Sequence, residues 1–516
     1  MAHRKEMVRM VKEFGIFING QWTESSRNEF FETLNPATGE VLARFARGNA
    51  RDVDLAVRSA EKGFRVWKEI PAPMRGEVLL KAALNLEKHK DELGLLVTKE
   101  MGKILSEGKG EVQEAIDFFK YMAGEGRRMF GETTPSELPD KFNMTVRLPK
   151  GPVGMITPWN FPVSIPSWKM GAALIAGCSI VLKPATDTPL CAARFVELVD
   201  EAGFPPGVIS MVPGSGSDVG SPLINHPSIR AISFTGGVAT GREVYTEGAK
   251  RLIQVHLELG GKNPVIVMDD ANMDIVADGV LFGAFGTSGQ RCTATSRLIV
   301  QEGAYRKLMD VLTARIEKLK VGNPADVDVD MGPVINRKAK DSIMGYIDIG
   351  KKEGGKVLTG GESLEGGVYS RGNFIQPTMI ETKHGSRIST EEIFGPVLSV
   401  IRVRDFDDAI SVANGVQYGL SSAIYTRDVN RAFKAIRLLE SGITYINAPT
   451  IGAEIHLPFG GVKSTGTGGR EAGSSAIEEF TELKSVFIDY SDRLQKAQID
   501  TESRLRERTE EVEKQA

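Results

Sequence analysis

The chain has 516 residues, of which 41% are hydrophobic and 25% charged, a composition typical of a globular protein rather than a disordered or membrane-embedded one. Its 64 Lys and Arg residues nearly balance 67 Asp and Glu residues, and the formal net charge is −3. No overall positive field therefore exists to attract nucleic acid or an anionic membrane. A chain of this length exceeds one hydrophobic core, so we expect two or three domains acting on a small molecule.

The cysteines and the start of the chain indicate the compartment. Cys178, Cys191 and Cys292 are too few and odd in number for a disulfide framework. Residues 1–14 carry charge throughout and lack the apolar core of a secretory signal, and they predict a short surface helix. Since no run of about 18 apolar residues predicts a membrane span, we expect a cytoplasmic enzyme without nucleic-acid or membrane partners.

The N-terminal part mixes short strands with helices. Residues 16–22 and 31–40 are predicted to be extended, with a hairpin signal at Asn19-Gly20. Apolar residues at helical spacing then predict helices from residue 52 to 101 and over 111–130. The alternation in residues 142–149 predicts another strand.

From residue 153 the chain alternates between short apolar strands and helices, which is typical of a parallel sheet with crossover helices. The predicted strands cover 153–157, 179–183, 208–212, 229–234, 255–259, 264–268, 297–301, 397–403, 422–425 and 443–447. We therefore predict an α/β protein with two parallel-sheet lobes that meet near Gly260-Gly261. The charged stretch after residue 492 favours a solvated or frayed helix over a partner-binding arm.

Cys292 is a candidate nucleophile because it follows Gly286 and Gly289 in a stretch of small and hydroxyl residues. A lone cysteine is more often a buried packing residue, so the hypothesis needs partners. Asn160 follows a predicted strand at a strand-to-helix turn, where an amide can donate to a developing oxyanion. Glu258 ends an apolar strand, where desolvation raises the pKa of a carboxylate and suits a general base.

Other strings suggest a cradle for a cofactor. Lys183 ends a strand at the same predicted sheet edge and could hold a ribose hydroxyl or a phosphate. The glycine turn of residues 235–241 begins a helix whose N-terminus favours a pyrophosphate. That turn lacks the Lys of a P-loop, which disfavours phosphoryl transfer. Each string alone is also compatible with an ordinary loop, and the six histidines lack zinc spacing, so we expect no metal.

Seven strings in this order resemble the aldehyde dehydrogenase superfamily over residues 15–490. They are Pro158-Trp-Asn-Phe-Pro162, Leu182-Lys-Pro184, Phe234-Thr-Gly-Gly-Val-Ala-Thr-Gly241, Leu257-Glu-Leu-Gly-Gly-Lys262, Gly289-Gln-Arg-Cys292, Glu391-Glu-Ile-Phe-Gly-Pro396 and Pro458-Phe-Gly-Gly-Val-Lys463. The resemblance implies two Rossmann-like lobes and a small β flap. The implied parts are an NAD(P)-binding domain (1–131 and 150–260), a catalytic domain (261–462), an oligomerisation flap (132–149 and 480–491) and a charged tail (492–516).

The resemblance also implies residue roles. Cys292 is the nucleophile, Glu258 the base, and Asn160 with the Cys292 backbone N–H the oxyanion hole. The implied cofactor contacts are Thr157, Trp159, Lys183, Thr186, Gly236, Gly237, Gly241, Glu392 and Phe394, with Lys183 also counted among the catalytic residues. The implied substrate contacts are Phe161, Trp168, Arg291, Thr450, Glu454 and Phe459. The reaction is oxidation of an aldehyde to the acid by hydride transfer to NAD(P)+, through a thiohemiacetal and a thioester on Cys292, and the presence of Glu258 favours hydrolysis over transfer to CoA.

Departures from the family pattern bear on specificity. Thr186 stands where many NAD-preferring members have a glutamate, and a neutral side chain does not repel a 2′-phosphate, so we expect use of NAD or NADP. Gly237 replaces a frequent serine. The collar of residues 447–458 and residues 469–474 are similar to a semialdehyde-oxidising, antiquitin-like branch, although Lys183-Pro-Ala is not. We therefore expect a semialdehyde substrate. The implied flap predicts a homodimer or homotetramer.

Two hypotheses of other classes compete with the dehydrogenase. A cysteine hydrolase or thioesterase would use Cys292 and Glu258 without redox chemistry. A binding protein would reuse the fold without catalysis. The presence of a nucleophile, a base and a cofactor cradle together favours the dehydrogenase.

Overall fold

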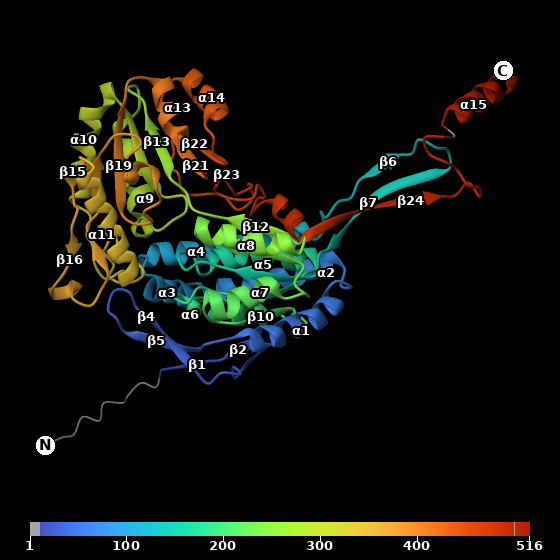
Figure 1. Cartoon of the computed structure of the whole chain (residues 1–516), viewed down its shortest axis with the longest axis horizontal. Coiled ribbons are helices and arrows are strands. Elements are labelled where there is room, and N and C mark those ends of the chain that lie inside the picture. The colour runs from blue at the N-terminus through green and yellow to red at the C-terminus, as the bar shows by residue number, and fades with distance from the viewer. Residues whose placement is uncertain (1–10, 500, 516) are drawn as a thin grey trace.

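The computed structural model describes residues 11–499 and 501–515. Two seven-stranded sheets with helices around them form two lobes, and a long, thin antiparallel sheet projects away from both (Figure 1). This architecture confirms the predicted α/β class. Most of the helix predicted for residues 1–14 lies outside the described residues. The last two residues of that range, Glu13–Phe14, form a strand, β1, that pairs with β5 instead of a helix.

The first sheet has the order β12-β11-β8-β9-β10-β2-β3. Its strands are β12 (Gln254–Glu258), β11 (Ala231–Thr235), β8 (Pro152–Ile156), β9 (Ser179–Lys183), β10 (Ile209–Met211), β2 (Ile16–Ile18) and β3 (Gln21–Thr23). The first five are parallel, and β2 and β3 form the predicted hairpin, with φ of 54° at Asn19 and 76° at Gly20. Positive φ at both turn positions is what a two-residue hairpin loop requires.

Helices surround this sheet and bury its apolar strands. They are α1 (Ala50–Trp67), α2 (Ala72–Lys88), α3 (Lys90–Met101), α4 (Leu105–Glu125), α5 (Ser164–Ala176), α6 (Pro189–Asp200), α7 (Ser221–Asn225) and α8 (Val238–Lys250). Every residue of α5 is buried, because this helix packs between the sheet and α4 and α2. Outside the sheet, β1, β5 (Val41–Ala46) and β4 (Phe30–Leu34) form a small sheet of their own.

The second sheet has the order β15-β18-β19-β14-β13-β21-β22 and is parallel except for β15. Its strands are β13 (Asn263–Val267), β14 (Thr295–Gln301), β15 (Lys356–Thr359), β18 (Thr378–Glu381), β19 (Val397–Val403), β21 (Ser421–Tyr425) and β22 (Ile443–Ile446). Its helices are α9 (Met273–Phe285), α10 (Glu302–Ile316), α11 (Arg337–Lys352), α12 (Arg387–Thr390), α13 (Phe406–Asn414) and α14 (Val429–Leu438). Two short pairs complete the lobe: β16 (Ser363–Leu364) with β17 (Phe374–Ile375), and β20 (Tyr418–Gly419) with β23 (Val462–Lys463).

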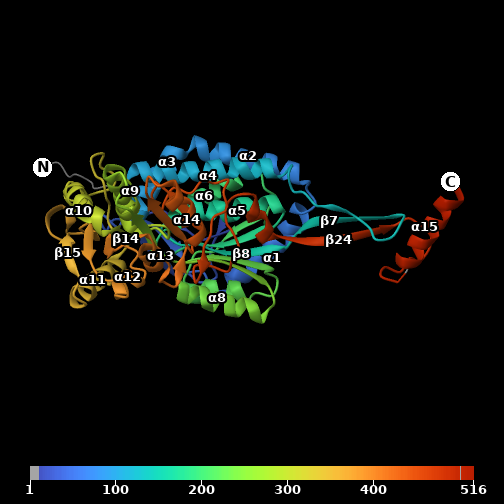
Figure 2. The same ribbon diagram turned by 90° about the horizontal axis from the view of Figure 1, so that it is seen from above.

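The projecting sheet consists of β6 (Thr133–Pro135), β7 (Lys141–Pro149) and β24 (Thr481–Asp489). β7 and β24 pair in antiparallel register from Thr481 opposite Pro149 to Asp489 opposite Lys141. Figure 2 shows this flap extending past the helices of the first lobe, with α15 (Thr501–Gln515) at its far end. Within the part of the chain that the structure describes, no helix combines the length and the apolar character needed to cross a membrane.

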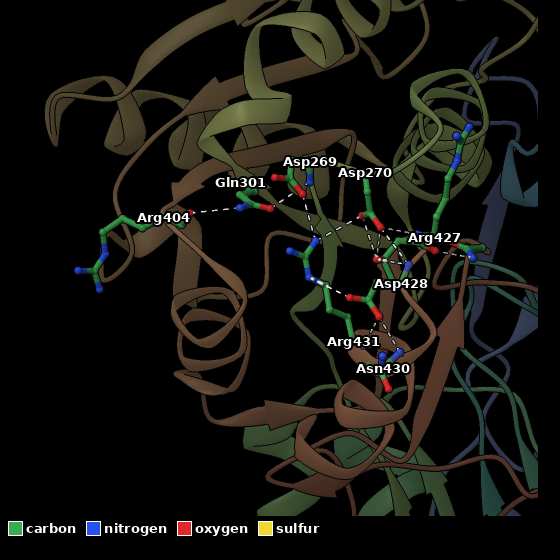
Figure 3. A network of polar contacts seen from close by, with 10 residues as sticks. Asp269, Asp270, Gln301, Arg404, Arg427, Asp428, Asn430 and Arg431 are labelled. Carbon is green, nitrogen blue, oxygen red and sulfur yellow. Dashed lines mark hydrogen bonds and ion pairs between the residues drawn. The ribbon is translucent and has the colours of Figure 1, made fainter.

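A network of hydrogen bonds and ion pairs lies at the carboxyl edge of the second sheet (Figure 3). The Asp270 carboxylate, just after β13, accepts hydrogen bonds of 2.9 Å from the Thr426 hydroxyl and from the backbone N–H groups of Arg427 and Asp428. Arg431 pairs with Asp269 at 3.1 Å. These bonds join the segment after β13 to the segment after β21, and the candidate site lies at the opposite edge of this sheet.

Candidate functional site

Cys292 lies where the carboxyl edge of the first sheet meets the amino edge of the second. Asn263, the first residue of β13, donates from its side-chain amide to the carbonyl oxygens of Cys292 at 2.8 Å and of Ala294 at 2.9 Å. Its own amide oxygen accepts the backbone N–H of Ser421 at 3.0 Å. These bonds fix the main chain around Cys292 to the start of the second sheet.

A left-handed turn between α9 and Cys292 sets the approach of the chain. Thr287, Ser288 and Gly289 have φ values of 52°, 55° and 69°, a conformation that costs a residue with a side chain roughly 1–2 kcal/mol. Glu107 accepts the Thr287 N–H at 2.9 Å, and the Ser288 hydroxyl donates to the Gly332 carbonyl at 2.8 Å. A Cβ at position 289 would overlap the Gly395 carbonyl, so glycine is required there for space as well as for φ.

Two cavities share the Cys292 side of this turn. One, of about 640 Å³, includes the predicted residues Trp159, Asn160, Gly236, Gly237, Glu392 and Phe394 in its wall. The other, of about 680 Å³, includes the predicted residues Phe161, Trp168, Glu258, Arg291 and Phe459. Cys292, Ile165, Thr235 and Leu259 belong to both walls, so Cys292 lies at the junction of the two cavities.

The Cys292 thiol is strongly disfavoured as a thiolate in the empty site. Burial raises its pKa to about 12, and the carboxylates of Glu258, Glu392 and Glu471 add to the effect. Asn160, on the same wall, donates one of its two amide N–H groups to the Gln290 carbonyl at 3.0 Å. This bond fixes the amide beside the sulfur.

Glu258 ends β12 and is 3% exposed. Neither of its oxygens has a hydrogen-bond partner in the described protein. Burial raises its pKa well above the ordinary value, as does the nearby Glu471 carboxylate, while Lys169 and Arg470 act in the opposite direction. An unpartnered carboxyl group with a raised pKa is a strong proton acceptor once ionised.

The larger set of predicted cofactor residues forms a cradle that fits a dinucleotide. Gly237 is the N-cap of α8, and nothing lies within 4 Å of the point where its side chain would begin. The Glu392 carboxylate, whose pKa burial raises to about 7, accepts the Gly261 N–H at 3.0 Å. Phe394 adopts a φ of 57° and packs edge-to-face on Trp159 at 5.4 Å. A free helix N-terminus, an acceptor and an aromatic pair therefore line one space.

Four predicted cofactor residues lie outside the wall of that cavity. Lys183 is 6% exposed and donates to the Pro184 carbonyl at 2.9 Å, and burial lowers its pKa to about 8. The Thr157 N–H donates to the Lys183 carbonyl at 3.2 Å, so these two are neighbours. Gly241 is buried inside α8, where a Cβ would overlap Leu259. Thr186 is exposed and lines a separate surface cavity of about 710 Å³.

Two predicted substrate contacts, Thr450 and Glu454, do not lie in the wall of the substrate-side cavity. Thr450 is fully buried, and its hydroxyl donates to the Thr293 carbonyl at 2.7 Å, so it points into the protein. Glu454 is exposed and pairs with His456 at 3.4 Å. The collar instead contributes Gly452 and Ala453 to the cavity wall.

An acidic stripe on α4 was not anticipated from the sequence. Glu107 pairs with Arg291 at 2.8 Å, and Glu111 accepts the N–H groups of Val163 and Ser164 at 2.7 and 3.1 Å, which caps α5. Glu114 lines the substrate-side cavity, and burial raises its pKa to about 8, with a contribution from Glu111. Spacings of four and three place all three on one helix face, a signal that usually indicates a solvated surface.

The thiol pKa gives a pH-dependent expectation for chemical modification. In the protein without ligands, the rate of Cys292 alkylation by iodoacetamide rises about tenfold per pH unit through pH 8–10, because the reactive thiolate is a minor species until the pH approaches about 12. Peptide mapping by mass spectrometry measures the rate. Cys178 and Cys191 are fully buried and serve as internal controls. A rate that levels off near pH 8 contradicts the raised pKa.

Comparison with known proteins assigns the chain. Residues 22–486 match the aldehyde dehydrogenase family model. The alpha-ketoglutaric semialdehyde dehydrogenase of Bacillus subtilis is 40% identical over 92% of this chain and 97% of its own length, and the NADP(+) succinate-semialdehyde dehydrogenase of Escherichia coli is 38% identical over 91% and 97%. The crystal structure of betaine aldehyde dehydrogenase from Staphylococcus aureus in complex with NAD+ matches with a TM-score of 0.91 at 35% identity, covering 94% of this chain and 96% of that one. The chain therefore belongs to the aldehyde dehydrogenase family, whose members oxidise aldehydes with NAD(P)+.

Proposed function

We propose that Cys292, Asn160 and Glu258 carry out the oxidation and that the substrate is a semialdehyde with a distal carboxylate. The observation that carries the assignment of roles is the position of Cys292 in both cavity walls, with Asn160 on the cofactor side and Glu258 on the substrate side. The first lobe (1–131 and 150–260) holds the dinucleotide, and residues 261–462 supply the nucleophile.

The first half of the reaction takes place at the sulfur. The Cys292 sulfur forms a bond to the aldehyde carbon as the thiol proton leaves, and the Asn160 amide and the Cys292 backbone N–H stabilise the resulting oxyanion. The bound nicotinamide supplies the acceptor for the hydride that leaves the same carbon. Glu392 and Lys183 would hold the riboses of the dinucleotide, and Phe394 would contact its nicotinamide.

The second half is hydrolysis of the thioester on Cys292. Glu258 takes a proton from water as the water oxygen attacks the acyl carbon, and the carbon–sulfur bond then breaks to release the acid. The two oxygens of Glu258 are suited to this step because neither accepts a hydrogen bond from the described residues.

Substitution at the sulfur and at the base tests the assignment. Cys292→Ala abolishes reduced-nicotinamide formation from an aldehyde panel, whereas Glu258→Gln retains a first-turnover burst and lowers the steady-state rate by about 10²–10⁴-fold. Absorbance at the reduced-nicotinamide band measures both. Cys178→Ala, in the core, is the matched control. Full activity of Cys292→Ala overturns the proposal, and ester turnover by protein that binds no dinucleotide favours the hydrolase alternative.

The chain uses NADP as well as NAD. Thr186 is uncharged and exposed at the first-lobe edge, and the E. coli relative is named for NADP(+). Thr186→Glu introduces a carboxylate that repels a 2′-phosphate and competes for the ribose hydroxyls. Its kcat/KM for NADP falls by about tenfold or more, a loss of about 1.4 kcal/mol or more, while that for NAD is maintained. Steady-state assays with both cofactors measure the ratio, and Thr186→Gln controls for size. An unchanged ratio contradicts the assignment.

The second cavity offers a distal carboxylate one basic partner, Arg291, beside three acidic wall residues, Glu114, Glu258 and Glu471. Arg291 is its only basic wall residue among those described, and the guanidinium is oriented by Glu107 and by the Thr287 hydroxyl at 2.9 Å. Glu114, opposite in sign when ionised, is neutral below its raised pKa of about 8. The named substrates of the Bacillus and Escherichia relatives are semialdehydes of this type.

The Glu114 pKa predicts how binding depends on pH. Above pH 8 the ionised Glu114 repels an anionic substrate, so KM for succinate semialdehyde rises severalfold between pH 7 and pH 9, while KM for butanal stays nearly constant. Glu114→Gln removes the rise because its amide does not ionise. Initial rates across this pH range measure both constants. The same pH dependence for both aldehydes, or an unaltered rise in Glu114→Gln, contradicts the role.

The flap assembles copies of the chain into a homodimer or homotetramer. Leu483, Phe487 and Ile488 on β24 are 61%, 69% and 44% exposed, and an exposed apolar strand on a thin sheet favours burial against another copy. Phe487→Lys therefore shifts the mass measured by light scattering toward the monomer. Deletion after Tyr490 leaves the number of subunits in the assembly unchanged, because α15 is a solvated helix. A monomeric wild type, or an unaltered assembly in Phe487→Lys, contradicts this arrangement.

A further inference from the structure

His256 is a buried titratable group that the reaction described above does not use. It lies on β12 two residues before Glu258, so the two side chains share a face of the strand, and it is 3% exposed. Its Nε2 is 3.7 Å from an oxygen of Glu258 and 3.7 Å from an oxygen of Glu471. Its Nδ1 is 3.2 Å from an oxygen of Glu479. The imidazole thus stands between three carboxylates.

This cluster leaves polar atoms without aligned hydrogen bonds. Neither nitrogen of His256 and neither oxygen of Glu258 has a hydrogen-bond partner in the described protein. Leaving such buried polar atoms without partners is unfavourable for the fold. Glycines keep the surrounding loop close without filling the space: a Cβ at Gly460 would lie 2.7 Å from a Glu258 oxygen, and a Cβ at Gly469 would overlap His256 and Glu479. A cost of this kind is expected where the groups exchange protons rather than hold the fold.

Of the three carboxyl groups around His256, that of Glu479 has an exposed hydrogen-bond partner. The Glu471 carboxylate pairs with Lys169, which is fully buried and donates to the Ser233 hydroxyl at 2.8 Å, so that side is closed. Glu479 is 12% exposed at its side chain and accepts a hydrogen bond of 2.9 Å from the exposed Gln254. Lys150 bonds the same Gln254. Glu258, His256 and Glu479 therefore form a line from the cavity to the surface.

The reaction requires such a line because it releases protons inside a buried site. An aldehyde, water and NAD(P)+ give a carboxylate, NAD(P)H and two protons, one from the thiol or thiohemiacetal step and one from the attacking water. Glu258 holds one proton and must lose it before the next turnover.

We propose that His256 passes the proton taken up by Glu258 to Glu479 and so to solvent. The water O–H bond breaks as its oxygen attacks the acyl carbon, and the proton goes to Glu258. The Glu258 proton moves to Nε2 of His256, the N–H bond at Nδ1 breaks, and that proton goes to Glu479 and then to bulk water. A flip of the ring by about 180° then turns the remaining N–H toward Glu479 and the unprotonated nitrogen toward Glu258, so the next proton can follow. His256 touches neither substrate nor cofactor, so it is a positioning residue that acts through Glu258, and the inference rests on the proposed role of Glu258.

His256→Gln tests the path because glutamine preserves hydrogen bonding but cannot carry the proton. In the full-length enzyme, the first-turnover burst keeps its rate, and the steady-state kcat falls at least about tenfold with a changed pH profile and solvent isotope effect. Added imidazole restores part of the loss. Hydrolysis of a p-nitrophenyl ester without dinucleotide slows by a similar factor, since it needs the same deacylation.

A second substitution and a control keep the test decisive if His256→Gln folds poorly. Glu479→Gln, nearer the surface, gives the same fall, and the double variant loses no more than either single one, because both interrupt one path. His226→Gln, whose ring pairs with Asp54 at 3.3 Å in the first lobe, leaves activity unchanged.

Three outcomes overturn the inference. They are a wild-type kcat and pH profile in His256→Gln, an equal loss of burst and steady state without rescue by imidazole, and a Glu479→Gln variant with normal turnover. Glu258→Gln separates this inference from the proposed function. If Glu258→Gln turns over normally, the proposed function fails, and if it is impaired while His256→Gln is not, only the proton path fails.

Discussion

The carboxylate of Glu107 is the interaction on which the geometry of the site depends. It accepts the N–H of Thr287 and pairs with Arg291, so it holds a left-handed turn of two side-chain-bearing residues and one glycine in place. That turn ends three residues before Cys292, and Asn263 fixes the chain on the far side. The backbone strain is thus balanced by bonds from both lobes, and the sulfur has one position relative to the two cavities.

Burial rather than any single neighbour gives the site its electrostatic character. Desolvation is the largest cause of the raised pKa values of Cys292, Glu258, Glu392 and Glu114. Each of these groups therefore favours its neutral form more than it would in water. Since proton release is costly in such an environment, movement of protons becomes as important as attack on the carbonyl, which is why the environment of His256 matters.

The sequence predicts the first sheet well because its strands are short, fully buried and separated by helices of clear period. The strand predicted for residues 179–183 matches the observed bounds of β9. Helix α4 begins at Leu105, six residues before the predicted start at 111. The prediction missed its first turns because Gly108 and Gly110 interrupt the apolar period. Between 321 and 396, two-residue strands such as β16 and β17 carry no alternation that a pattern can detect.

The candidate site shows the same division. Local strings identified Cys292, Asn160, Glu258, Glu392 and Phe394, which the structure brings to two adjoining cavities. Thr450 and Glu454 lie in a collar whose backbone direction no local pattern specifies, and one side chain turns inward while the other turns to solvent. Glu114 and Glu471 share a cavity wall with Cys292 only through tertiary packing. The local sequence around Cys292 therefore could not predict them.

The stripe of Glu107, Glu111 and Glu114 also limits how relatives of this protein can diverge. One helix face positions the nucleophile turn, caps α5 and lines the substrate wall. Insertion of one residue within the stripe would rotate the following turn by about 100° and disconnect these tasks at once. Point substitution at the third position alters only the wall. The helix therefore cannot change length within the stripe without loss of these contacts, whereas a single substitution at Glu114 can change the substrate wall.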